Sequence, residues 1–159
     1  MNKLLLHSQE ILVYEKGVFI MPKCKVIAIT NQKGGVGKTT TTENVAIGLA
    51  RNGWNVDFDP QGDLTSCLGW KNNDSLEHSV SSMLDDYIND NDINYESLIL
   101  HHEEHVDLIP ANIELADFEM RLVSVINREQ TLSNCIEPLR NQYDYIFIDC
   151  PPSLGMLTV

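Results

Sequence analysis

The sequence is poor in basic residues. Its 159 residues include 11 Lys and Arg against 23 Asp and Glu, which gives a formal net charge of −12. The imbalance is greatest over residues 71–110, where one lysine stands among ten acidic residues. Because affinity for nucleic-acid phosphates depends on Lys and Arg, this composition argues against sequence-independent DNA binding by these residues alone. A block of like charge is typical of a solvated face.

Long apolar runs and paired cysteines are also missing. The longest apolar runs, such as residues 11–14 and 26–29, are far shorter than the roughly 20 residues of a membrane-spanning helix. The cysteines have no Cys-x-x-Cys or other metal-ligand spacing, so in a cytoplasmic protein we expect small buried apolar side chains. They are Cys24, Cys67, Cys135 and Cys150. With 43% hydrophobic and 21% charged residues, the composition is that of one globular domain.

The first twenty residues differ from the rest of the chain. Their apolar stretches at 4–6 and 11–14 are interrupted by polar residues, and no small-residue cleavage site follows, which disfavours a signal peptide. Met21 opens directly into an apolar, strand-like run. We therefore expect residues 1–20 to be a non-native upstream extension and residues 21–159 to be the domain. The alternative is a genuine short arm that packs on the domain.

The apolar pattern predicts strands that alternate with helices. Short β-branched runs are typical of parallel strands buried on both faces. The strand pattern covers residues 24–30, 55–59, 106–110 and 145–149. The helical pattern covers residues 39–51, 79–88, 112–126 and 131–142. Residues 60–78 are expected to be rich in loops. The alternation indicates an α/β fold with a mainly parallel sheet.

Local signals refine the predicted helices. Asn52-Gly53 should end the first helix, Asn112 can cap the third, and Pro138 should kink or restart the last. Apolar residues at helical spacing predict which side of each helix forms an apolar stripe that faces the core. In the first helix the stripe consists of Val45, Ala46, Leu49 and Ala50, and in the third of Ile113, Ala116, Met120 and Val123.

Residues 33–40 lie between a predicted strand and a predicted helix, which is the context that a phosphate-binding loop requires. Glycines let the backbone curl so that several N–H groups point at one anion, and the helix start adds its positive end. Lys38 can reach the β- and γ-phosphates, and the Thr39 hydroxyl can ligate Mg²⁺. The expected nucleotide-binding residues are Lys33, Gly34, Gly35, Val36, Gly37, Lys38, Thr39 and Thr40.

In detail the loop departs from the usual pattern G-x-x-x-x-G-K-[ST], because Gln32 replaces its first glycine and Lys33 directly precedes the glycine pair. It resembles the deviant Walker A family of ATPases, K-G-G-x-G-K-[ST], which includes ParA partition proteins, MinD and the nitrogenase iron protein. Residues 57–62, 108–115 and 143–155 resemble further ParA motifs in family order. The resemblance runs from about Lys23 to Val159. It implies a P-loop NTPase-like three-layer fold, incomplete on the C-terminal side.

The resemblance also implies roles. Lys33 would contact ATP across a homodimer that sandwiches the nucleotide, and there it would stabilise charge on the leaving phosphoryl group. Asp57 would hold Mg²⁺ through water, and Asp59 would orient the attacking water. Asp149 would contact the direct ligands of the metal rather than the metal itself. Lys33 and Asp59 are thus the expected catalytic residues, and Thr39, Asp57 and Asp149 the metal site.

The implied function is that of a cytoplasmic partition ATPase. It would hydrolyse ATP with Mg²⁺ during plasmid or chromosome segregation, dimerise on ATP and act with a ParB-type partner. Full-length relatives would associate with the nucleoid, touching nonspecific DNA through a C-terminal part that this chain lacks, and no membrane contact is implied. Because the chain ends just after the motif at 143–155, we also expect an open sheet edge or apolar face.

A local departure concerns the second strand. The family has about three apolar residues between the valine and the first aspartate, whereas here Asp57 follows Val56 directly. Some 10 Å of strand is therefore missing, so the strand must recruit residues 53–55, shorten, or unwind the preceding helix. The two departures leave open a module that binds nucleotide without hydrolysing it, or an incomplete gene product without activity.

Two other signals are interpreted as structural. The motif H-x-x-E-H of zinc proteases is matched by His101, Glu104 and His105. Its chemistry needs both histidines on one face of a long helix. A strand is predicted directly afterwards, so we expect a polar surface turn. Trp54 and Trp70 are expected to be packing residues rather than adenine contacts.

Overall fold

The computed structural model describes most of the chain between Lys3 and Pro151. The described residues are 3–6, 9–14, 17–20, 24–54, 56–59, 62–72, 75–112, 114–122, 125 and 127–151. Only the backbone is described for the segments before residue 24, for residues 56–59, and for residues 62, 63, 116 and 119.

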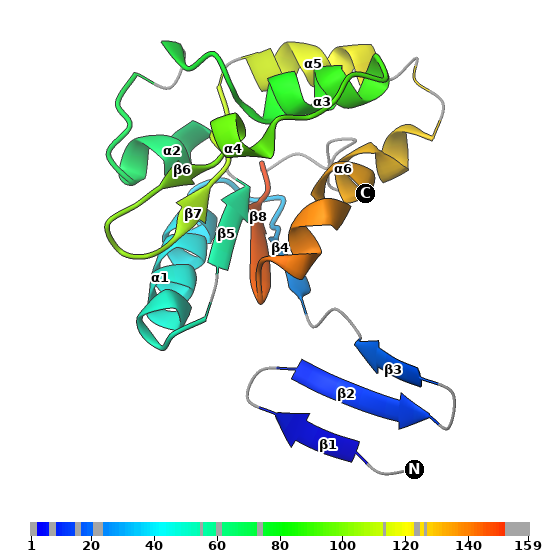
Figure 1. Ribbon diagram of the computed structural model, residues 1–159. Coiled ribbons are helices and arrows are strands. Elements are labelled where there is room, and N and C mark those ends of the chain that lie inside the picture. The colour runs from blue at the N-terminus through cyan, green and yellow to red at the C-terminus, as the bar shows by residue number, and fades with distance from the viewer. Residues whose placement is uncertain are drawn as a thin grey trace.

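A five-stranded sheet lies at the centre of the domain (Figure 1). Its strands are β4 (Lys25–Ile29), β5 (Val56–Asp59), β6 (Leu100–His101), β7 (Asp107–Leu108) and β8 (Tyr145–Asp149). They follow the order β4-β8-β5-β7-β6, and every pair is parallel except the antiparallel pair of β6 and β7. The four expected strands and the mainly parallel sheet are confirmed, whereas β6 was not expected.

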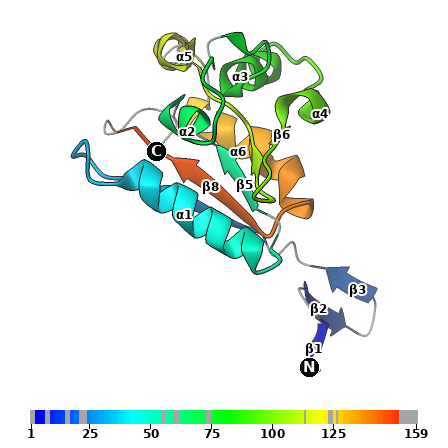
Figure 2. The ribbon, with the colours of Figure 1, turned by 90° about the vertical axis from the view of Figure 1, so that its left-hand side faces the viewer.

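Helices cover the sheet on both faces, with α1 on one side and α6 on the other (Figures 1 and 2). The helices are α1 (Lys38–Arg51), α2 (Gly62–Cys67), α3 (Val80–Ile88), α4 (Tyr95–Leu98), α5 (Glu114–Leu122) and α6 (Thr131–Ile136). Two 3₁₀ helices, η2 (Arg128–Gln130) and η3 (Glu137–Asn141), flank α6. None of the described helices combines the length and apolar character that crossing a membrane requires.

The packing of β8 explains the three layers. Ile146 packs with buried residues of α3, α5 and α6, whereas Phe147 packs with buried residues of α1 and α2. Successive residues of a strand point to opposite faces of the sheet, so one strand is buried on both sides. The expected α/β fold with three layers is therefore confirmed.

Helix α1 has the expected ends but a shifted buried face. It is followed by Asn52 as C-cap and by Gly53, which has a left-handed φ of +84°. Its buried side chains are Thr42, Ala46 and Ala50, spaced four residues apart. Val45 is 44% exposed, so its place in the buried stripe was wrong. The short alanine side chains let the helix backbone approach the sheet, and Val45 lies on the next face.

Helix α5 shows the same kind of shift. Phe118 and Leu122 are buried, whereas Met120 is 70% exposed and was wrongly placed in the stripe. Ile113 and Val123 lie outside the described residues. Helical spacing alone allows more than one apolar face, and the packing against α3 selects the face of Phe118 and Leu122.

The segment expected to be loop-rich contains α2, so that expectation was wrong for residues 62–67. Leu64 and Leu68 are four residues apart and buried, which stabilises this short helix against the sheet. At the end of α6 the expectation is confirmed, because Pro138 lies in η3, where the α-helix has given way to a 3₁₀ turn. Cys135 and Cys150 are buried and Cys24 is half-buried, but Cys67 is exposed, contrary to expectation.

Three strands between Lys3 and Ile20 form a sheet of their own. β1 (Lys3–Leu6), β2 (Gln9–Tyr14) and β3 (Gly17–Ile20) pair as an antiparallel three-stranded sheet. The apolar pattern of the sequence did not lead us to expect these strands. The boundary at residue 20 stays a prediction.

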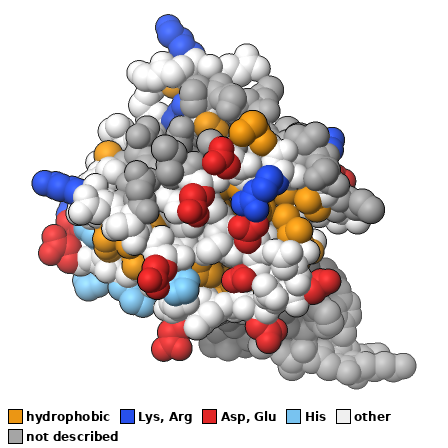
Figure 3. Space-filling view, turned by 90° about the horizontal axis from the view of Figure 1, so that it is seen from above, with side chains coloured by type: hydrophobic (Ala, Val, Ile, Leu, Met, Phe, Trp, Pro, Cys, Tyr) orange, Lys and Arg blue, Asp and Glu red, His pale blue; other side chains and the backbone are white. Residues whose placement is uncertain are grey.

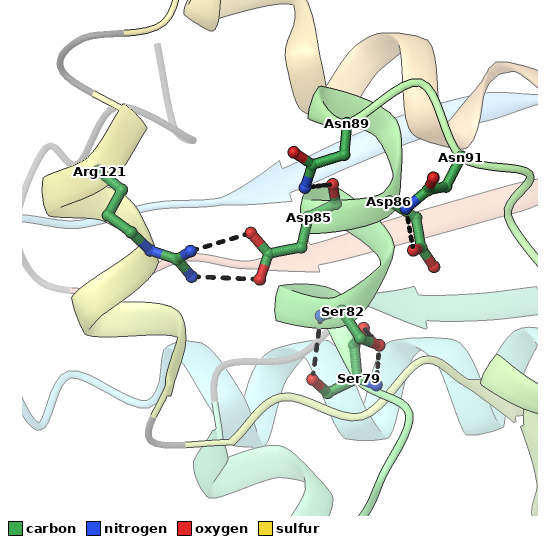
Figure 4. A network of polar contacts seen from close by, with 7 residues as sticks. All are labelled: Ser79, Ser82, Asp85, Asp86, Asn89, Asn91 and Arg121. Carbon is green, nitrogen blue, oxygen red and sulfur yellow. Dashed lines mark hydrogen bonds and ion pairs between the residues drawn. The ribbon is translucent and has the colours of Figure 1, made fainter.

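The described acidic residues of the block 71–110 are exposed or half-buried, as expected for a solvated face. Acidic side chains are spread over the face at the top of Figure 1, seen directly in Figure 3. One of them joins two helices, because Asp85 of α3 accepts two hydrogen bonds from Arg121 of α5, at 3.0 and 3.2 Å (Figure 4). The start of α3 is held by Ser79 and Ser82, whose side chains cap each other's backbone N–H groups.

Candidate functional site

The predicted phosphate loop lies between the end of β4 and the start of α1. Gly35 and Gly37 have left-handed φ angles of +68° and +85°, which residues other than glycine rarely adopt. A Cβ added at Gly34, Gly35 or Gly37 would meet no described protein atom within 4 Å. Within the described part of the chain, nothing packs against the outer side of these glycines, which leaves room for an anion to approach.

The conformation of the loop is held by short polar contacts. The Asn31 side chain accepts a hydrogen bond from the Lys33 N–H at 2.9 Å, and the Thr41 hydroxyl donates to the Gly37 carbonyl at 2.7 Å. The first turn of α1 contains no acidic residue, so no carboxylate there offsets the positive end of the helix. The loop thus offers N–H groups and a helix terminus, which together favour a phosphate.

Asn31 is a residue of the loop to which the sequence pattern assigned no role. A signal for it exists, because an Asn side chain commonly accepts a hydrogen bond from the backbone two residues further on and so stabilises a turn.

A hydrogen bond joins the loop side of the site to β8. The Thr39 Oγ1 donates to Oδ2 of Asp149 at 2.6 Å, across 110 positions of sequence. Asp149 is the last residue of β8 and only 3% exposed. Ile29 and Asp149 are register partners, and the Cys150 N–H donates to the Ile29 carbonyl at 3.2 Å. The parallel strands β4 and β8 thus end side by side and bring these two predicted metal-site residues together.

The other predicted binding residues are accessible. Lys33, Gly34, Gly35, Val36, Gly37 and Thr40 are exposed, and Lys38 and Thr39 are half-buried. The exposed position of Lys33 leaves it open to a neighbouring molecule. A hydroxyl and a carboxylate in direct contact are hard oxygen ligands of the kind that Mg²⁺ prefers, and open glycine backbone suits the phosphates. The residues present therefore fit a magnesium nucleotide.

The two aspartates of β5 occupy different heights in the sheet. Asp57 is the register partner of Ile146 in β8, and Asp59 is the partner of Ile148. Helix α1 keeps its full length to Arg51, and β5 begins only at Val56. Of the three outcomes open for the missing residues, the strand has therefore shortened. It has four residues, against five in β4 and β8.

The two signals interpreted as structural are confirmed as such. His101 ends β6 and pairs with Asp107, whereas Glu104 and His105 lie in the following turn, with His105 at a φ of +61°. Glu104 accepts two hydrogen bonds from Arg51, at 2.8 and 2.9 Å.

Both tryptophans are packing residues. Trp54 meets Tyr145 edge-on with ring centroids 5.6 Å apart, and Trp70 packs at 5.7 Å from His102. Both indoles also contact the buried cluster between α1 and the sheet.

Comparison with known proteins agrees with this geometry. A family model described as an AAA domain matches residues 24–159. The sporulation initiation inhibitor protein Soj of Bacillus subtilis is 49% identical over 138 residues, which are 85% of this chain and 53% of Soj. The chromosome partitioning protein ParA of Myxococcus xanthus is 44% identical over 140 residues, 85% of this chain and 47% of that protein.

A solved structure adds a likeness in three dimensions. Cobyrinic acid a,c-diamide synthase from Mycobacterium smegmatis, with bound ATP analog and magnesium, gives a TM-score of 0.76 at 39% identity. The match covers 85% of this chain and 54% of that one. The chain thus spans about half the length of the relatives that it matches. On the family match, the shared loop and the shared fold, the chain belongs to the AAA domain family, in its ParA/Soj-type group of P-loop ATPases.

Proposed function

We propose that this chain binds Mg·ATP at residues 33–40 and forms the nucleotide-binding part of a partition ATPase. The observation that carries the proposal is the 2.6 Å hydrogen bond from Thr39 to Asp149. It sets a hydroxyl from the first turn of α1 against a carboxylate at the end of β8. Both side chains belong to the elements that flank the glycine loop. A Cβ built on any of the three loop glycines would have no described protein atom within 4 Å.

Each group has a distinct task in this proposal. The backbone N–H groups of the glycine loop and the start of α1 hold the phosphates, and Lys38 adds a positive charge beside them. Thr39 is a direct metal ligand, and Asp149 orients the Thr39 hydroxyl through the observed hydrogen bond. When bound, Mg²⁺ neutralises charge on the β- and γ-phosphates.

The wider activity is proposed on the likeness to the partition relatives. In this proposal two copies dimerise on ATP, and Lys33 of each copy reaches the nucleotide held by the other. Its exposed place at the start of the loop supports such a contact between chains. The process served is plasmid or chromosome segregation in the cytoplasm, with a ParB-type partner. Contact with nonspecific DNA is not assigned to these residues, since their net charge is −12.

A second candidate is nucleotide binding with little hydrolysis. The short β5 favours it, because this strand contains both aspartates for which the family resemblance implies a role, one in holding Mg²⁺ and one in orienting the attacking water. Displacing a catalytic group by about 1 Å can cost 10²-fold in rate. Phosphate release at saturating Mg·ATP separates the two candidates: turnover as fast as that of a full-length relative contradicts the second.

Binding is tested with Lys38→Ala in the full chain. Calorimetric titration with Mg·ATP should show a loss of affinity of at least about tenfold, since hydrogen bonds to charged groups contribute about 1.5–3 kcal/mol. Lys71→Ala is the matched control, because Lys71 is exposed in a turn outside the loop. Equal affinities of Lys38→Ala and the control contradict the assignment of the loop.

A further inference from the structure

The two edge strands of the central sheet differ in how they are protected (Figure 1). β6, at one edge, has two residues, and its His101 pairs with Asp107 of β7. β4, at the other edge, has five residues, of which only Lys25 is charged and none is proline. Natural edge strands avoid further pairing by being very short or through charged residues, proline or bulges. β4 therefore has the form of a strand that can accept another neighbour.

The exposure of β4 agrees with an uncovered edge. Ala28 is exposed, and Val26 and Ile27 are half-buried. The register partners of Val26 and Ile27 in β8, Ile146 and Phe147, are buried. Val26 contacts the buried cluster on one face of the sheet and Ile27 the cluster on the other. Among the described strands β8 alone pairs with β4, so apolar side chains on both faces remain partly in contact with water.

The hydrogen bonds to β8 determine which backbone groups of β4 point outward. The Lys25 N–H donates to the Asp144 carbonyl at 2.9 Å, and the Ile29 carbonyl accepts from the Cys150 N–H at 3.2 Å. Successive residues of a strand direct their N–H and C=O groups to alternate sides. The first, third and fifth residues of β4 therefore bond to β8, and the second and fourth direct their N–H and C=O groups away from it.

These outward residues, Val26 and Ala28, can pair with the same two residues of a second copy. In an antiparallel pair, residues of a hydrogen-bonded pair exchange both of their N–H···O bonds. A twofold axis at Ile27, the middle residue of β4, sets Val26 of each copy opposite Ala28 of the other. All four outward N–H groups, two from each copy, then donate to the four outward carbonyls. The strand is thus complementary to itself.

The distribution of charge permits contact at this edge. Two copies with a net charge of −12 repel each other, but β6 and β7, the strands of the acidic block 71–110, lie at the opposite edge of the sheet. The charged residue of β4, Lys25, lies with its Nζ 5.7 Å from the ring centroid of Tyr145. The twofold pairing sets Lys25 opposite Ile29 of the other copy, so the two lysines lie at opposite ends of the contact.

We infer that two copies of this chain associate through β4, antiparallel about Ile27, and so join their five-stranded sheets into one continuous sheet. Because both copies use the same surface, the contact closes as a dimer. It needs no nucleotide, so it is independent of the proposed function and distinct from ATP-dependent dimerisation. Five residues a side are far fewer than the roughly 20–30 of a stable interface. The association therefore forms at high protein concentration, well above that at which ATP-dependent dimerisation is measured.

The test is sedimentation equilibrium of the 159-residue chain in EDTA without nucleotide, from low micromolar to near-millimolar concentration. The parent should pass from monomer to dimer. Ala28→Pro should weaken association at least about tenfold, because it removes two of the four hydrogen bonds. The ladder to β8 does not use this N–H, and proline is tolerated in an edge strand where its nitrogen faces solvent. Ala28→Ser is the matched control, which keeps the N–H and should associate like the parent.

Hydrogen exchange followed by NMR tests the register in the parent chain itself. The amides of Val26 and Ala28 should exchange slowly at high protein concentration and rapidly at low concentration. The amides of Ile27 and Ile29, which the ladder directs to β8, should exchange slowly at both. If Ala28→Pro does not fold, as circular dichroism would show, the exchange measurement decides.

Three results contradict the inference. The first is a parent chain that stays monomeric over the whole range, which leaves β4 to a strand of another protein or of a longer chain. The second is a folded Ala28→Pro variant that associates as strongly as the parent. The third is a dimer in which the amides of Val26 and Ala28 exchange as rapidly as in the monomer. None of these results bears on ATP binding at the loop, which is measured separately with Lys38→Ala.

Discussion

Replacing Thr39 by valine removes the hydroxyl that joins α1 to β8 while keeping the shape of the side chain. The hydroxyl donates to a carboxylate that is 3% exposed, at 2.6 Å. Hydrogen bonds to charged groups contribute about 1.5–3 kcal/mol, and a buried carboxylate that loses this donor is stabilised less. We expect the free energy of unfolding to fall by about 2 kcal/mol. For a chain of this size, the midpoint of thermal unfolding should fall by roughly 4–8 °C.

Two controls isolate the hydrogen bond in a urea titration followed by circular dichroism. Thr39→Ser keeps the hydroxyl and should lose less than half as much stability as Thr39→Val. Thr40→Val makes the same change at the exposed neighbouring position and should shift the free energy by less than about 0.5 kcal/mol. If Thr39→Val is no less stable than Thr39→Ser, the hydrogen bond does not hold the two elements together and the reasoning is refuted.

The remaining predictions concern the dimer and the core. Lys33→Ala should leave ATP binding to the monomer unchanged but remove ATP-dependent dimerisation, and sedimentation that still shows a dimer with ATP contradicts this role. Leu64→Ala should lower the free energy of unfolding by about 2–5 kcal/mol, because Leu64 is fully buried in the cluster between α1, α2 and the sheet. The control Val45→Ala, at a position 44% exposed, should change it by less than about 1 kcal/mol, and equal losses in urea unfolding would contradict the burial of α2.

Much of the fold was predictable because the signals are local. The four expected strands and the ends of α1 follow from β-branched runs and from Asn52-Gly53. Pro138 ends an α-helix because it lacks an N–H group and its ring clashes with the preceding turn. Each of these effects acts within a few residues, so no distant partner is needed to foresee it.

The candidate site was predictable in part. The spacing of glycines and lysines is enough to indicate a phosphate loop. Thr39 and Asp149, which were both predicted to belong to the metal site, are joined by a hydrogen bond, and their roles toward a metal stay predictions. The roles of Lys33, Lys38, Asp57 and Asp59 stay predictions.

The sequence by itself indicated a phosphate loop and predicted the four main parallel strands and the helix that follows the loop, because glycine conformations, caps and apolar runs act locally. Only the tertiary structure decided which face of each helix is buried, as Val45 and Met120 show. It also decided that residues 62–67 form a helix and that β5 places Asp57 beside Ile146. These outcomes depend on which neighbour an element packs against, and on where one strand begins to pair with the next. Such information is shared between distant segments and is not contained in either one alone.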